Sequence, residues 1–171
     1  MPATKSFAGI GGFVAGDKEV ISYLRFNLRS QIYAKSLPMA MTIGAIKRLE
    51  MMKNNPELRE RLWEITNALQ KGFREAGFDL GRTQSPVTPV FFNGELEQTT
   101  YLIRDLRRNY GIFCSVVVYP VVPRGVIMLR IIPTAVHTME DVNYTIQAFK
   151  EVKKKLDANV YPSDKIADFR N

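Results

Sequence analysis

The sequence is poor in cysteine and histidine, the residues that most often build crosslinks and zinc sites. It holds a single cysteine, Cys114, and a single histidine, His137, in 171 residues. One cysteine cannot form an internal disulfide, and one of each is too few for a Cys/His zinc site. We therefore expect a cytoplasmic protein of a reducing compartment, without a metal site.

Long apolar runs are also missing. No stretch of 18 or more apolar residues occurs, so the sequence predicts no membrane-spanning helix. Residues 1–6 do not combine a charged start with an apolar stretch, and we expect no secretory signal. Hydrophobic residues nevertheless make up 46% of the chain, which is a folding composition. The length allows one domain, or one small domain and part of another.

Positive charge is in excess, because 24 Lys and Arg residues outnumber 17 Asp and Glu residues. The formal net charge of +7 suggests attraction to a polyanion, which includes a phosphorylated cofactor or substrate. The basic residues are spread over three helical stretches that also carry acids, a pattern typical of solvated helix faces. No zinc finger, RNP motif or basic zipper region is present. We expect no nucleic-acid partner.

The first 54 residues do not look like a complete domain. The pattern predicts a short strand over residues 13–15, a helix capped by Asp17, a loop or extended segment over residues 28–37, and a helix opened by Pro38. These elements are too few to bury a core. Residues 1–54 therefore suggest the end of a larger domain.

Regular patterns begin at Pro56. The order of helices and strands up to Leu156 is α-β-α-β-β-α, which predicts a compact α+β domain over residues 55–157. The first helix carries one apolar stripe and is closed by Gly77. The stripe consists of Leu58, Leu62, Ile65, Leu69 and Phe73.

The strands of this domain are expected in three segments. Residues 87–92 form one, and residues 113–118 and 126–132 form two more that can pair antiparallel across a turn-rich loop. A helix over 96–110 separates the first strand from the other two. The predicted layer structure is a small, largely antiparallel sheet with helices on one face. The last helix begins at a capping box from Thr138 to Asp141, and residues 158–171 are a polar tail.

Two cationic residues are candidates for chemistry. Lys5 stands beside small, flexible residues; it is either a solvated surface charge or a lysine that forms a Schiff base. The glycine-rich run after it does not fit a dinucleotide fingerprint, because no strand precedes it. Arg130 lies within an apolar strand. It is either an edge-strand arginine facing water or a buried one that needs a carboxylate partner.

The lone histidine and cysteine have simpler interpretations. His137 stands just before a helix, where a histidine usually makes a structural hydrogen bond. Cys114 lies in an apolar stretch without a neighbouring histidine, so we expect buried, inert packing.

Several segments in order resemble one enzyme family. The run Thr4-Lys5-Ser6-Phe7-Ala8 with the glycine-rich residues 11–16 resembles the pyridoxal-phosphate lysine motif of the α-oxoamine synthases. This family includes glycine C-acetyltransferase, 8-amino-7-oxononanoate synthase and serine palmitoyltransferase. Residues 33–38 resemble its phosphate-binding segment. Further similar segments, up to about Leu156, are residues 56–63, 76–78, 119–125, 129–130 and 135–138.

The resemblance implies a fold, a cofactor and residue roles. The chain would be the C-terminal portion of a type I pyridoxal-phosphate enzyme, beginning at the cofactor lysine. It would hold the small C-terminal domain and a remnant of the large domain. Lys5 would bind pyridoxal 5′-phosphate covalently and move protons at the substrate α-carbon, and Arg130 would pair with the amino-acid carboxylate. Ser36 would contact the cofactor phosphate in the neighbouring subunit of a homodimer, although Ala34 replaces the usual first hydroxyl residue of that segment.

The implied reaction is a decarboxylating condensation of glycine, serine or alanine with an acyl-CoA. The segment before the lysine carries most of the family's cofactor contacts, so we expect this chain by itself to be inactive. One alternative is part of a class I/II aminotransferase of the same fold. Another is a non-catalytic interaction domain. The surroundings of Lys5 and the segment over residues 135–138 favour the synthases.

Overall fold

The structure is a computed structural model of the 171-residue chain, and it describes residues 9–162. The chain divides into two compact units, Met1–Pro56 and Glu57–Asn171. The predicted division into functional domains at residues 1–54, 55–157 and 158–171 stays a prediction.

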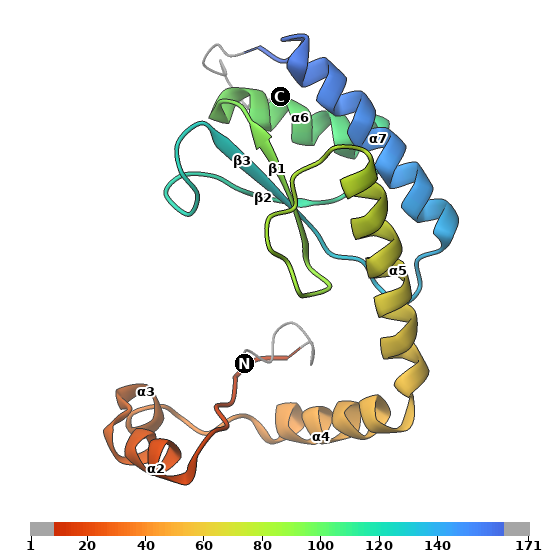
Figure 1. Cartoon of the computed structure of the whole chain (residues 1–171). Coiled ribbons are helices and arrows are strands. Elements are labelled where there is room, and N and C mark those ends of the chain that lie inside the picture. The colour runs from red at the N-terminus through yellow and green to blue at the C-terminus, as the bar shows by residue number, and fades with distance from the viewer. Residues whose placement is uncertain (1–8, 163–171) are drawn as a thin grey trace. The chain divides into compact units, whose positions relative to one another are not determined.

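The described part of the first unit consists mainly of helices whose side chains are largely exposed. They are α2 (Lys18–Asn27), α3 (Arg29–Ile32) and α4 (Met39–Asn54), labelled in Figure 1. Asp17 and Pro38 precede α2 and α4 as predicted, although the Asp17 side chain makes no capping hydrogen bond. No described residue between 9 and 56 is buried.

Two predictions for the first unit are wrong. Residues 13–15 do not form a strand, and residues 29–32 form the short helix α3 within the segment predicted to be a loop or extended. A strand needs a neighbour to receive its backbone hydrogen bonds. The named strands among the described residues all lie in the second unit, between residues 88 and 131.

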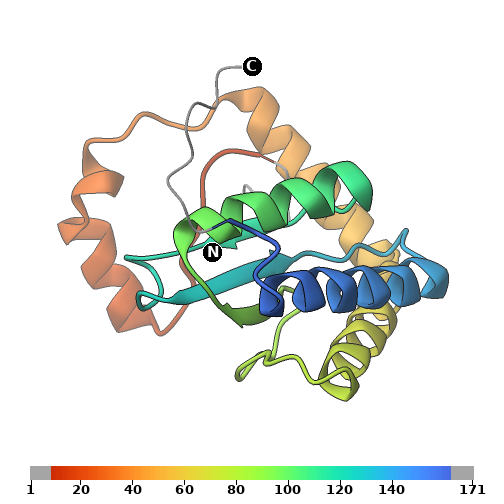
Figure 2. The same ribbon diagram turned by 90° about the horizontal axis from the view of Figure 1, so that it is seen from above.

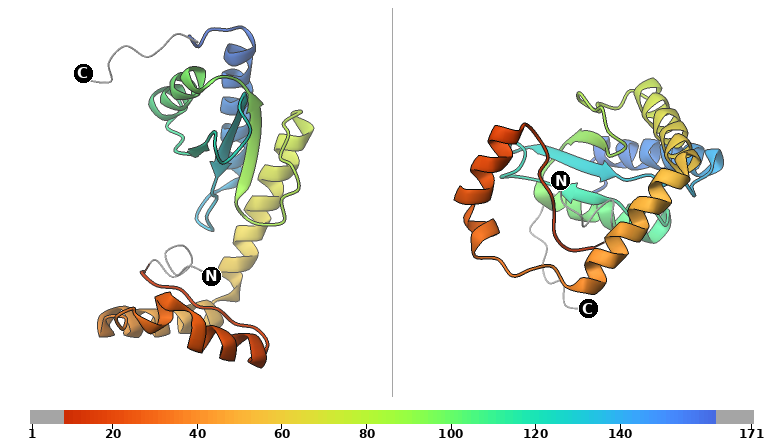
Figure 3. Two further views of the ribbon diagram at one scale, coloured as in Figure 1. Left: turned by 90° about the vertical axis from the view of Figure 1, so that its left-hand side faces the viewer. Right: turned by 90° about the horizontal axis from the view of Figure 1, so that it is seen from below.

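The second unit has the predicted order of elements. Helix α5 (Pro56–Glu75) leads to β1 (Thr88–Asn93), and α6 (Leu96–Asn109) leads to β2 (Ser115–Val117). Strand β3 (Val126–Ile131) and helix α7 (Met139–Asp157) follow. Figures 2 and 3 show these strands and helices from other sides.

The three strands form one antiparallel sheet in the order β1-β3-β2. The predicted pairing of the last two strands is therefore confirmed, and β1 pairs with the opposite edge of β3. Burial alternates along β3: Ile127, Leu129 and Ile131 are buried, whereas the residues between them are half-buried. One face of the sheet thus contacts the core and the other does not.

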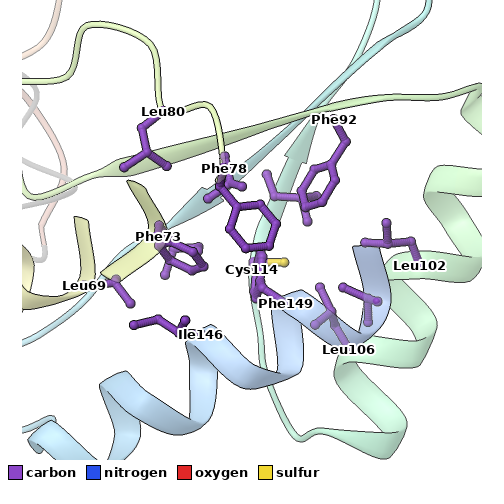
Figure 4. Packing of buried hydrophobic residues seen from close by; sticks show 14 of the residues in the cluster. Leu69, Phe73, Phe78, Leu80, Phe92, Leu102, Leu106, Cys114, Ile146 and Phe149 are labelled. Carbon is purple, nitrogen blue, oxygen red and sulfur yellow. The ribbon is translucent and has the colours of Figure 1, made fainter. Parts of the chain in front are cut away.

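The core lies between the sheet and helices α5, α6 and α7. Figure 4 shows side chains from all three helices gathered against the strands. Phe73 of α5 and Phe149 of α7 are fully buried, with ring centroids 5.1 Å apart in an edge-on arrangement. The apolar stripe of α5 was predicted too long, because Leu58 is 55% exposed and burial starts at Ile65.

Local signals set the helix ends in this unit. Gly77 has a φ of +79° and closes α5, since its N–H donates to Arg74 O and the next N–H, that of Phe78, donates to Phe73 O. Helix α7 begins at the predicted capping box, in which Thr138 and Asp141 bond each other's backbone N–H groups.

Candidate active site

The structure describes two of the three predicted site residues, Ser36 and Arg130. Lys5 lies outside the described residues, so its predicted role stays a prediction. Ser36 belongs to the first unit and Arg130 to the second.

Ser36 is exposed in the segment that connects α3 to α4. The side chain of its neighbour Leu37 packs against the backbone of Gly11, where a Cβ would stand 3.0 Å from Leu37 Cδ2. Gly11 also has a φ of +100°, which favours glycine. The glycine-rich run and the Ser36 segment, two motifs of the resemblance, therefore lie side by side.

A groove of about 710 Å³ runs beside this contact in the first unit. Its lining includes Gly11, Gly12 and Phe13 and, from α2, Leu24 and Arg25. The exposed Ser36 hydroxyl is a hydrogen-bond donor of the kind that contacts a cofactor phosphate, although Ser36 does not line this groove. The donor set in the described residues is compatible with part of a pyridoxal-phosphate site.

Arg130 projects from the sheet face opposite the core. The strand register places Pro89, Arg130 and Ser115 in one row across β1, β3 and β2. Arg130 is half-buried, and its Nε donates a hydrogen bond to Ser115 Oγ at 3.1 Å. The other interpretation of Arg130, an arginine on an edge strand that faces water, is excluded because β3 is the central strand of the sheet.

The charge of Arg130 has no ion-pair partner in the described part of the chain. The strand positions on its face hold no acid. The other residues at these positions are Pro89, Phe91, Asn93, Ser115, Val117, Val126 and Met128. A half-buried guanidinium without a carboxylate partner in the protein can bind an anionic ligand through two hydrogen bonds. The site can therefore bind a carboxylate.

His137 makes the structural hydrogen bond that was predicted. Its Nδ1 accepts a hydrogen bond from the Thr134 N–H at 2.9 Å. Its backbone carbonyl accepts a bond from Arg61 Nη2 at 3.3 Å. These contacts fix the turn before α7.

Cys114 is buried and packs in the core, as predicted. Burial raises the pKa of its thiol to about 11, so the thiolate is scarce at neutral pH. A nucleophilic role is therefore disfavoured. Among residues 9–162, no cluster of three His, Cys, Asp or Glu side chains could hold a metal ion.

Sequence reasoning missed Ser115 as a partner of Arg130. A serine within an apolar β run was visible, but pairing it with Arg130 requires the register of β2 against β3. No helix within the described residues is long and apolar enough to cross a membrane.

Known proteins resemble this chain over most of its length. The family model "Aminotransferase class I and II" matches residues 3–149. A cysteate-C-fatty acyltransferase of Capnocytophaga ochracea is 54% identical over 157 residues, which cover 92% of this chain and 37% of the relative. A serine palmitoyltransferase of Sphingobacterium spiritivorum is 36% identical, over 89% of this chain and 38% of the relative.

A solved structure shares the arrangement of the chain. It is a serine palmitoyltransferase with a PLP internal aldimine; the TM-score is 0.76 at 26% identity, covering 91% of this chain and 39% of that one. The chain thus spans less than two fifths of the length of these proteins. The fold expected from the sequence, a C-terminal part of a type I enzyme, agrees with this match.

Proposed function

Because the chain belongs to the aminotransferase class I and II family, we propose that it is the C-terminal part of a pyridoxal-phosphate-dependent acyltransferase. The enzyme would condense an amino acid with a fatty acyl-CoA, with loss of the amino-acid carboxylate, to give an α-oxoamine. The similar acyltransferases support this reaction. They also confirm the resemblance to the α-oxoamine synthases.

One structural observation carries the proposal for this chain's own residues. Arg130 stands half-buried on the open sheet face, has no carboxylate partner among the described residues, and is fixed by Ser115. A guanidinium in that setting is suited to two-point binding of a carboxylate. It would hold the amino-acid substrate by this group.

The remaining roles follow the resemblance. When bound, pyridoxal phosphate supplies an electron sink for the substrate α-carbon. Lys5 would hold the cofactor and move the proton at the α-carbon. Ser36 would donate its hydroxyl proton in a hydrogen bond to the cofactor phosphate.

The identity of the amino-acid substrate is a further part of this proposal. We infer a small amino acid, glycine, serine or alanine, to which the name of the relative at 54% identity adds cysteate. All four carry the carboxylate that Arg130 would bind. Product analysis with each amino acid and a fatty acyl-CoA distinguishes them. Formation of product from a keto acid instead would favour an aminotransferase.

We infer a homodimer in the cytoplasm. In the described first unit, α4 exposes large apolar side chains at many positions around the helix, and a helix of this kind is usually covered by further protein. They are Met39, Met41, Ile43, Ile46, Leu49, Met51 and Met52, each 40–75% exposed. The rest of the cofactor domain and a second subunit would cover them.

The test is Arg130→Lys in the enzyme that contains this chain. Lysine keeps the charge but loses the planar two-point contact. The KM for the amino acid should rise steeply, by an amount equivalent to about 2–5 kcal/mol if the bound pair is desolvated in the complete enzyme. The KM for the acyl-CoA should change little.

The matched control is Arg74→Lys, at an exposed position on α5. It should leave both KM values unchanged. If Arg130→Lys also leaves the amino-acid KM and turnover unchanged, Arg130 does not bind the substrate carboxylate.

A further inference from the structure

We propose that Ser115 is a positioning residue, which holds the Arg130 guanidinium in the orientation that binds the substrate carboxylate. This inference rests on the role of Arg130 proposed above. The observation that supports it is that Ser115 of β2 and Arg130 of β3 are paired directly across the two strands.

The hydrogen bond between the two side chains selects one edge of the guanidinium. Arg130 Nε donates to Ser115 Oγ at 3.1 Å. A carboxylate can bind an arginine side-on, through Nε and one Nη, or end-on, through both Nη atoms. With Nε engaged by Ser115, the end-on edge remains for the ligand, and neither Nη has a partner among the described residues.

The neighbouring strand positions on this face offer Arg130 no polar side chain besides Ser115. Pro89, on the other side of the row, has an apolar ring. The next row along the face consists of Phe91, Met128 and Val117, all half-buried and apolar. In the absence of the Ser115 hydroxyl, the long arginine side chain would gain rotamers, and its Nε–H would lose its acceptor.

Both partners stand on paired strands, so the contact is set by the backbone. Ser115 and Arg130 are directly opposite each other in the antiparallel register, and their side chains share one face. A group that is fixed in this way costs little further ordering when the ligand binds. Ser115 therefore acts through Arg130 without touching the substrate.

The experiment compares Ser115→Ala and Ser115→Thr in the enzyme that contains this chain. Alanine removes the acceptor, and the amino-acid KM should rise about tenfold, the size expected for a lost hydrogen bond to a charged group. Threonine keeps the hydroxyl and should stay within about twofold of the wild type. The acyl-CoA KM should not change in either variant. Ser85→Ala, at an exposed serine of the same unit, is the control.

A double variant separates positioning from a general structural effect. In an Arg130→Lys background the Nε donor is gone, so adding Ser115→Ala should raise the amino-acid KM no further. Independent, additive losses would overturn the proposal, as would a wild-type KM in Ser115→Ala while Arg130→Lys is impaired. If Arg130→Lys itself has no effect, the proposed function fails first, and the role of Ser115 with it.

Discussion

Asp105 shows how a single buried carboxylate can join three segments of the second unit. It receives hydrogen bonds from Lys155 Nζ of α7 at 2.7 Å, from Tyr161 Oη at 2.6 Å and from Asn109 Nδ2 at 2.6 Å. Burial by itself would raise the pKa of Asp105, but these hydrogen bonds outweigh it and hold the pKa below its usual value. The charged form is therefore the one that stabilises the fold.

The contribution of Asp105 should depend on pH. Because its pKa is lower in the folded than in the unfolded chain, its stabilisation is present above about pH 4 and is lost as the pH falls through the folded-state value. Asp105→Asn should lower the free energy of unfolding by about 1–3 kcal/mol at pH 7. Urea unfolding of the variant and the wild type at pH 7 and pH 3 should show this difference shrinking on acidification.

A suitable control for Asp105 is Asp157→Asn. Asp157 forms an exposed pair with Lys153 on one helix, and such pairs contribute little. A difference between Asp105→Asn and wild type that is the same at both pH values would show that the charge of Asp105 is not what stabilises the unit.

At the scale of elements, the end of α5 depends on one backbone conformation. Gly77 occupies the left-handed region, and a Cβ placed there would meet no atom within 4 Å. The cost of a side chain at this position is therefore a cost of the backbone conformation, free of any clash. This separates Gly77 from glycines whose neighbours leave no space.

Gly77→Ala should lower the free energy of unfolding of the second unit by about 1 kcal/mol, since the Cβ of alanine makes a positive φ unfavourable. Gly77→Asn should cost less, because asparagine tolerates this region. Thermal unfolding followed by circular dichroism measures both. Gly16→Ala is the control, as Gly16 has open space and no such φ. Equal midpoints for Gly77→Ala and Gly77→Asn would contradict the explanation.

The elements of the second unit were predictable because local and global signals agree. Gly77 and the Thr138 capping box mark helix ends, and the stripe from Ile65 to Phe73 matches the buried face of α5. Leu58 continues the stripe in sequence but lies beyond the part of α5 that the core covers. Periodicity shows which face is apolar, but not how much of it finds a partner.

The site was predictable to a smaller extent. The sequence placed Arg130 in an apolar strand over residues 126–132 but left open whether it is buried or faces water, and the structure shows that it lies half-buried on the face away from the core. The contact with Ser115 was not predictable, because eight residues separate the two strands and leave the register open. The role of Lys5 came from the resemblance, since nothing in its own segment specifies the chemistry.

At the scale of the whole molecule, the two units differ in what holds them together. The core cluster consists entirely of residues between Ile65 and Tyr161. Tyr161 is buried although it lies in the segment expected to be a polar tail. None of the described residues of the first unit is buried. The second unit therefore has the means to fold by itself.

Limited proteolysis of the chain should cut before residue 55 and leave a protected fragment that begins near α5. Segments with little burial open at low free-energy cost, whereas cleavage in the core requires global unfolding. Mass spectrometry of the early fragments identifies the sites. Early cleavage between residues 90 and 135, with residues 9–54 still intact, would contradict this view of the chain.

The strand order β1-β3-β2 also bears on the way the sheet is assembled during synthesis. The central strand is the last of the three to leave the ribosome, so the edge of β1 that pairs with β3 has no partner strand until about 30 more residues have been made. The other edge of β1 can already bond to Asp79, which precedes it in the chain. The hairpin of β2 and β3 closes a short loop and can form first. The pairing of β1 with β3 places Pro89 beside Arg130. It closes a longer loop, so we expect it to form later.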